Sequence, residues 1–118
     1  MTATVVAAVD DFFFQTKIKE AARAVGIEMV FEPTIEGAVA AIQKRNARLL
    51  IIDLDTKAFA PAELLAAASG VKTVGYLPHV RGDLRKAAEA AGCGLVLPRS
   101  AFVKRLASLL EEARDAGR

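Results

Sequence analysis

Acidic residues at the ends of two apolar runs are the part of the sequence most suited to chemistry. Asp10 and Asp11 follow a β-branched run (TVVAAV), and the segment LLIIDLD places Asp53 directly after four aliphatic residues. A strand that is buried on both faces rarely ends in an unpaired acid, because burying such a charge costs several kcal/mol. Either the strand reaches the surface at Asp53, or the carboxylate has been placed at its mouth for a purpose.

A bound cation would supply that purpose. If Asp10, Asp11 and Asp53 share one edge of a sheet, their like charges repel and raise each other's pKa unless a cation lies among them. A shallow site with only oxygen ligands suits Mg²⁺, which binds through one or two carboxylates and keeps several waters. The sequence therefore predicts a Mg²⁺ site at this edge, with solvated turn residues as the alternative interpretation.

Five strand-like runs, alternating with segments of helical spacing, would position these acids. Repeated strand–helix units predict a doubly wound α/β domain, a five-stranded parallel sheet with five helices in three layers. In the flavodoxin-like strand order 2-1-3-4-5, the first and third strands are neighbours, and sites form beyond the carboxyl ends of the strands. The strands are expected at Thr4–Val9, Ile27–Phe31, Ala47–Ile52, Val71–Tyr76 and Gly94–Leu97.

The residues at the expected helix ends agree with this pattern. Thr34 can cap the second helix, Pro61 suits the first turn of the third, and Ser100 can cap the fifth. Three glycines stand where the first, third and fourth helices should stop: Gly26, Gly70 and Gly92.

Length and composition narrow the class of protein. A chain of 118 residues fits one domain over residues 1–118, and its apolar runs are far too short to span a bilayer. No secretory signal is visible, and the lone Cys93 cannot form an internal disulfide, so a cytoplasmic location is expected. The formal charge of +2 and the absence of tryptophan give little support to nucleic-acid binding.

The segments TVVAAVDD, LLIIDLD and AAGCGLVLPRS together resemble the receiver domain of bacterial two-component response regulators. The resemblance implies that Asp53 accepts a phosphoryl group from a histidine kinase, a phosphotransfer protein or a small phosphodonor. It also implies that Asp11 binds Mg²⁺ directly, Asp10 lies in its outer shell and Asp55 offers a backbone carbonyl. No enzyme activity is expected beyond self-phosphorylation and self-dephosphorylation.

Three departures from the family's pattern qualify that expectation. The family's Ser or Thr after the fourth strand falls here on Gly75 or Tyr76, because Thr73 lies too early. Arg99, preceded by proline, stands in place of the family's Lys, and Val96 replaces a frequent aromatic residue. A degenerate receiver that binds partners without phosphorylation is therefore the alternative. A small-molecule-binding flavodoxin-like protein is a weaker one, since no glycine-rich loop follows the first strand.

Other residues are candidates for contacts with partners. Phe12 and Phe13 either pack locally and partly cover the acidic site, or form an exposed surface for a partner. His79 fits a surface loop, with a role near the phosphoryl site as the alternative. Nothing follows the fifth helix, so output is expected through protein contacts. A weak homodimer, or a hetero-contact, is predicted through helix four, strand five and helix five, with a monomer as the alternative. Its charged residues are Arg81, Arg85, Lys86, Lys104, Arg105, Glu111 and Glu112.

Overall fold

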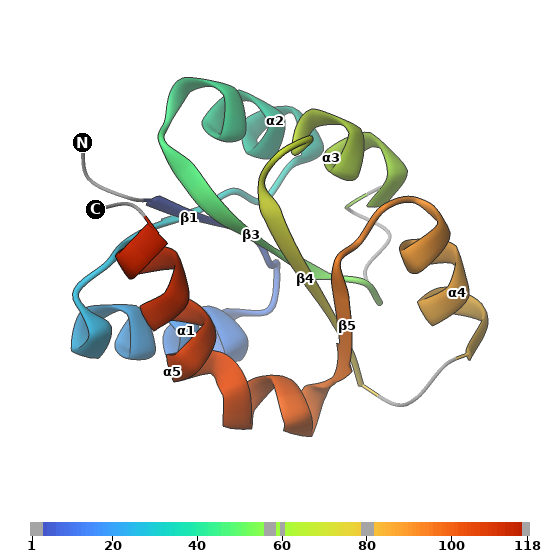
Figure 1. Ribbon diagram of the computed structural model, residues 1–118. Helices are drawn as coiled ribbons and strands as arrows, with labels where there is room; N and C mark the ends of the chain where they lie inside the picture. Colours follow the sequence, from blue (N-terminus) through green and yellow to red (C-terminus); the bar gives the residue numbers. More distant parts are fainter. Residues whose placement is uncertain (1–3, 56–58, 60, 79–81, 117–118) are drawn as a thin grey trace.

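A five-stranded parallel sheet forms the centre of the molecule (Figure 1). The strand order is β2-β1-β3-β4-β5, which confirms the predicted flavodoxin-like fold. The computed structural model describes residues 4–55, 59, 61–78 and 82–116. Along the chain the elements are β1 (Thr4–Ala8), α1 (Phe12–Val25), β2 (Glu28–Phe31), α2 (Ile35–Lys44), β3 (Ala47–Asp53), α3 (Pro61–Ala67), β4 (Lys72–Leu77), α4 (Gly82–Ala90), β5 (Leu95–Pro98) and α5 (Arg99–Ala116).

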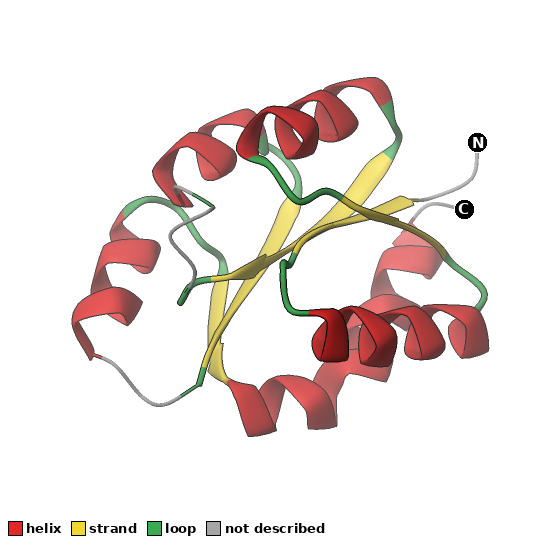
Figure 2. Ribbon diagram, turned by 180° about the vertical axis from the view of Figure 1, so that it is seen from behind, coloured by secondary structure: helices red, strands yellow, loops and turns green. Residues whose placement is uncertain are grey.

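Helices cover both faces of the sheet, because successive strand side chains point to opposite faces. Val5 and Ala7 of β1 pack in one core with α1 and α5, whereas Val6 and Ala8 pack in a second core with α2, α3 and α4. The view from behind shows the same three layers (Figure 2). Within the described residues, no helix is both long and apolar enough to cross a membrane.

Most of the predicted helix ends are confirmed. The Thr34 hydroxyl accepts a hydrogen bond from the Gly37 N–H at 3.0 Å and caps α2, and α3 begins at Pro61. The prediction for Ser100 is wrong: α5 begins at Arg99, because β5 runs into the helix without a loop, and Ser100 lies in the first turn. Glycines with positive φ follow α1, α3 and α4, as expected: Gly26 (84°), Gly70 (85°) and Gly92 (105°).

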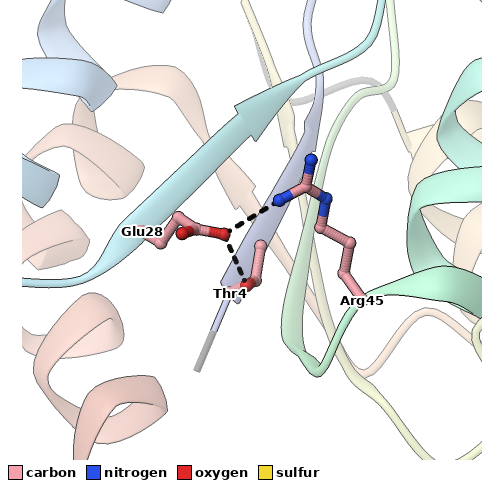
Figure 3. Close-up of polar contacts among 3 residues, drawn as sticks. All are labelled: Thr4, Glu28 and Arg45. Atoms are coloured by element: carbon pink, nitrogen blue, oxygen red, sulfur yellow. Dashed lines mark hydrogen bonds and ion pairs between the residues drawn. The ribbon is translucent and has the colours of Figure 1, made fainter. Parts of the chain in front are cut away.

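Polar side chains at the amino-terminal end of the sheet bind one another (Figure 3). One carboxylate oxygen of Glu28, on the edge strand β2, accepts hydrogen bonds from the Thr4 hydroxyl and the Arg45 guanidinium, each at 3.1 Å. This cluster ties β2 to β1 and to the end of α2. The buried Thr4 hydroxyl therefore has its partner inside the fold.

Candidate functional site

Acidic side chains gather at the opposite, carboxyl-terminal end of the sheet. β1 and β3 are paired in parallel, so the segments that follow them leave the sheet at the same edge. The four acids predicted to hold the metal line one depression of about 460 Å³, together with Arg99. They are Asp10, Asp11, Asp53 and Asp55. The structure thus places every one of the predicted acids in the same site.

Asp53 is the buried member of this group. Only 6% of the Asp53 surface is exposed to solvent, whereas Asp10 and Asp55 are exposed residues. One carboxylate oxygen of Asp53 accepts a hydrogen bond from the Asp55 N–H at 3.0 Å. Burial raises the pKa of Asp53; the Asp55 N–H and the Arg99 charge oppose this rise, and the charges of Asp55 and Asp11 add to it. Without a bound cation, burial and the neighbouring acids destabilise the ionised form of the Asp53 carboxylate.

Asp11 has a second role that the sequence interpretation missed. Its side chain caps α1 by accepting a hydrogen bond from the Phe14 N–H at 3.1 Å. The helical spacing of apolar residues begins at Phe14, so the spacing alone does not show that the helix starts at Phe12. An acid just before a helical run is a preferred N-cap, so the signal was present in the sequence.

The donor set fits Mg²⁺ in its chemistry but is not assembled around an ion. Within the described part of the chain, no three acidic, histidine or cysteine side chains converge closely enough to hold a metal. The capping bond of Asp11 and the Asp55–Asp53 hydrogen bond each use a single carboxylate oxygen, Oδ1. Carboxylates and backbone carbonyls that share one shallow depression are suitable hard-cation ligands.

Tyr76 lies opposite Asp53 in the register of β3 and β4. Its ring is fully buried and stacks between two phenylalanines, with centroids 4.9 Å from Phe14 and 4.8 Å from Phe102. Among the described residues, no group is placed to form a geometrically good hydrogen bond with the phenol oxygen, although Asp53 lies near it. Burial raises the pKa of Tyr76, and the Asp53 carboxylate adds to this rise through its charge and a weak contact with the hydroxyl. A buried hydroxyl without a partner is uncommon and is typical of functional or strained sites.

Gly75 cannot take the place of the family's Ser or Thr. A Cβ atom added there would lie 2.6 Å from Cδ1 of Leu54, so any side chain at this position would require the packed leucine to shift. Thr73 lies two residues before Gly75 on β4 and is buried. Its hydroxyl accepts a hydrogen bond from the Gly94 N–H at 2.8 Å. Tyr76 therefore carries the hydroxyl nearest Asp53 on β4.

Arg99 joins the aromatic stack, and within the described part of the chain it forms no ion pair with an acid. Its guanidinium carbon lies 4.7 Å from the centroid of Phe14 and 5.9 Å from that of Tyr76. The buried Arg99 Nε likewise has no hydrogen-bond partner among these residues. Its positive charge still acts on Asp53 and opposes the rise that burial causes in the pKa of that carboxyl group. The cation predicted to replace the family's lysine is thus at the site, held by ring contacts.

Of the remaining candidates, Phe12 also lines the acidic depression, whereas Phe13 lines a neighbouring groove. Phe12 and Phe13 are 80% and 66% exposed, so local packing does not account for them. Cys93 is a small buried residue whose thiol donates to the Leu95 carbonyl. The interpretations of His79 and Arg81 fall outside the described residues.

Solved structures of response regulators have folds similar to this one. No model of a protein family and no curated protein matches the sequence. Solved structures do match: a response regulator from Hahella chejuensis is similar with a TM-score of 0.85 and 18% identity, covering 99% of this chain and 98% of that one. A response regulator from Thermotoga maritima gives 0.78 and 14%, covering 98% and 99%. The chemotaxis response regulator CheY4 of Vibrio cholerae gives 0.78 and 15%, covering 96% and 99%. The chain therefore has the fold of a CheY-like receiver domain.

Proposed function

We propose that this chain is a phosphorelay receiver domain that accepts a phosphoryl group on Asp53 with the help of Mg²⁺. The observation that carries the proposal is the buried Asp53 carboxylate at the carboxyl end of β3, inside a depression lined by three further acids and one arginine. The fold, which is similar to that of solved receiver domains, supports this proposal, and the acidic side chains could perform the phosphoryl transfer. A cytoplasmic location and a histidine kinase or phosphotransfer protein as donor are parts of the same proposal.

The proposed transfer is a displacement at phosphorus. An Asp53 carboxylate oxygen forms a new bond to phosphorus while the bond from phosphorus to the donor atom breaks, and the donor leaves with that electron pair. Bound Mg²⁺ would supply positive charge that offsets the repulsion between the acids and the phosphoryl oxygens. Asp11, Asp53 and the backbone carbonyl of Asp55 would hold the ion, with Asp10 in its outer shell.

The chain's other polar groups are expected to make this transfer slow. Tyr76 is fixed in the aromatic stack, so its hydroxyl cannot move toward the phosphoryl group as a short side chain does. Arg99 must leave its contact with Phe14 to reach a phosphoryl oxygen directly. No catalytic activity is proposed beyond this self-phosphorylation and the hydrolysis that reverses it.

Intact-mass measurement after incubation with acetyl phosphate and Mg²⁺ tests the proposal. Wild-type protein should gain the mass of one phosphoryl group, slowly and in part, whereas Asp53→Asn should gain none. Asp55→Asn is the matched control, because its proposed contribution is a backbone carbonyl, and it should still be labelled. Equal labelling of wild type and Asp53→Asn, or no adduct at any Mg²⁺ concentration, would reject the phosphoacceptor.

A degenerate receiver is the second candidate, and the aromatic stack favours it. The phenol of Tyr76 and the guanidinium of Arg99 occupy the region where the family's short hydroxyl and lysine would act on a phosphoryl group. Such a domain would bind partners through its surfaces in one fixed state. Absence of a phosphoryl adduct, together with unchanged partner binding by Asp53→Asn, would select this function.

The predicted homodimer through α4, β5 and α5 stays a prediction. Arg85 lies 3.5 Å from Glu89 of the same helix, and Glu112 pairs with Lys72, so some of the predicted charges bind within one molecule. Among the described residues of this face, Val103 is the one exposed large hydrophobic residue. Arg105→Glu should weaken self-association if this face is the interface, and sedimentation at increasing concentration would measure the effect.

A further inference from the structure

All the exposed large hydrophobic residues in the described part of the chain lie at one corner of the molecule. Phe12 and Phe13 begin α1, and Val103, 38% exposed, lies in the first turns of α5. Phe13 and Val103 line a groove of about 410 Å³ together with Lys17, Arg99 and other residues. We call Phe13, Lys17 and Val103 the Phe13 surface. Exposed apolar side chains that line one groove, with charged residues beside them, are typical of a contact site for a partner.

The Phe13 surface is basic as well as apolar. The Lys17 ammonium lies 5.3 Å from the centroid of the Phe13 ring, so a cation and an aromatic side chain stand together on the outside of α1. Asp11, the acid that lines the same groove, already binds the Phe14 N–H as the cap of the helix. The surface therefore fits a partner that offers an apolar pocket next to acidic side chains.

Such a pocket exists on the other face of this chain. A groove of about 470 Å³ lies between α2 and α3, with partly buried Ile35, Val39, Ala40 and Ala67 in it and exposed Glu36 and Glu63 at its rim. Neither glutamate forms an ion pair within the described residues. We call this the α2–α3 groove. Figures 1 and 2 show α1 and α5 on one side of the sheet and α2 and α3 on the other.

We propose that the Phe13 surface of one molecule docks into the α2–α3 groove of a second copy. The Phe13 ring would enter the apolar groove, and Lys17 would approach Glu36 and Glu63. The two surfaces are complementary in charge, Lys17 against Glu36 and Glu63, and both are apolar, which is what selects a second copy as the occupant. Because the surfaces lie on opposite faces, the contact is head-to-tail and leaves one free surface of each kind at the ends. Association then continues into short open chains and does not stop at a dimer.

This contact uses α1 and the α2–α3 groove in place of α4 and β5, and it shares only Val103 of α5 with the interface expected there. We expect it to form without phosphorylation and without Mg²⁺. Small interfaces give weak complexes, so the average mass should rise gradually with protein concentration. Sedimentation velocity in EDTA, from about 20 to about 500 μM protein, would detect this rise.

Two blocked variants test the head-to-tail arrangement directly. Phe13→Glu removes one surface and leaves the groove, whereas the double variant Glu36→Lys/Glu63→Lys reverses the rim of the groove and leaves the Phe13 surface. Each alone should associate at least about tenfold more weakly than wild type. An equal mixture should form a one-to-one dimer that grows no further, because each partner retains the half that the other lacks. Phe13→Ser, which adds no charge, should repeat the loss seen with Phe13→Glu.

Matched controls separate this contact from general surface effects. Lys19→Glu and Glu20→Lys change the charge of α1 outside the groove, and both should associate as wild type does. Circular-dichroism melting checks that all variants fold. Self-association of the Glu36→Lys/Glu63→Lys variant at wild-type strength, a mixture that stays monomeric, or a wild type that is monomeric throughout would overturn the proposal. The last result would leave a different protein as the occupant of the Phe13 surface.

Discussion

The two ends of the sheet treat their polar groups in opposite ways. At the amino-terminal end, Thr4, Glu28 and Arg45 bind one another, and the Arg114 guanidinium donates to the Val25 carbonyl at 2.8 Å. At the carboxyl-terminal end the buried Tyr76 hydroxyl has no hydrogen-bond partner among the described residues. Satisfied polar groups stabilise a fold, whereas unsatisfied ones oppose it. The amino-terminal end of this sheet therefore pairs its polar groups, and the carboxyl-terminal end carries the groups of the proposed phosphoryl transfer.

The contrast also explains why the site is at this end. Parallel strands bring all their carboxyl ends to one edge, and the segments that follow are free to carry acids. Asp53 is the last residue of β3 and is buried there, whereas the polar residues that begin β2 and β4, Glu28 and Lys72, are exposed and paired. Three predictions follow from the contrast, in order of the expected effect.

Replacing Tyr76 should produce the largest change. Tyr76→Ser would restore a short hydroxyl but would remove the central ring of the stack between Phe14 and Phe102, so unfolding free energy should fall by about 3–5 kcal/mol. Tyr76→Phe keeps the ring and removes only the unpartnered hydroxyl, so it should be neutral or raise stability by about 1 kcal/mol. Urea unfolding measures both, and a marked loss of stability in Tyr76→Phe would show that the hydroxyl has a partner in solution.

Asp53→Asn should stabilise the protein at neutral pH by about 1–3 kcal/mol, because it removes a buried charge and keeps an oxygen for the Asp55 N–H. The pKa of Asp53 is raised in the folded state. Below the unfolded-state pKa, near 3.8, the carboxyl is protonated in both states, so the wild type bears no cost for a buried charge. Stability of the wild type falls as the pH rises from there through the folded-state pKa. The gain should therefore shrink as the pH is lowered toward this window. Urea unfolding in EDTA at several pH values measures it, and a gain that is independent of pH would contradict the assignment.

The amino-terminal end should respond with the opposite sign. Glu28→Ala removes the acceptor of the buried Thr4 hydroxyl and the partner of Arg45, so unfolding free energy should fall by about 1 kcal/mol. Glu20→Ala, an exposed acid in the middle of α1 and outside this cluster, serves as the control and should leave stability nearly unchanged. If both alanine variants behaved alike, the cluster would contribute nothing measurable.

The fold was accessible from the sequence because its signals are local. Apolar runs such as LLIIDLD, helical spacing and the glycine at position 26 each report on a few neighbouring residues. The strands predicted in this way differ from the observed ones by at most one residue at each end. The N-cap at Asp11 was also a local signal, and it was overlooked because the acid had been assigned to a metal.

The character of the site depends on contacts between distant segments, which a single sequence does not reveal. Phe14, Tyr76 and Phe102 come from three different elements and meet only in the folded core. Their stack fixes Tyr76 and supports Arg99, so it decides how both residues relate to Asp53. Sequence reasoning could name the substituted positions but could not give their surroundings.

Unfolding in the presence and absence of Mg²⁺ tests most directly whether the carboxyl-terminal end is a cation-dependent site. A site with a dissociation constant of about 1 mM should raise the unfolding free energy of the wild type by about 1.4 kcal/mol at about 10 mM Mg²⁺, at constant ionic strength. Asp53→Asn should lose this increase. Asp11→Asn should also lose it while still capping α1, since asparagine is an equally good N-cap. Glu111→Gln, on α5 outside the depression, should retain it. An equal increase in wild type and both Asp variants, or none in wild type, would contradict the site.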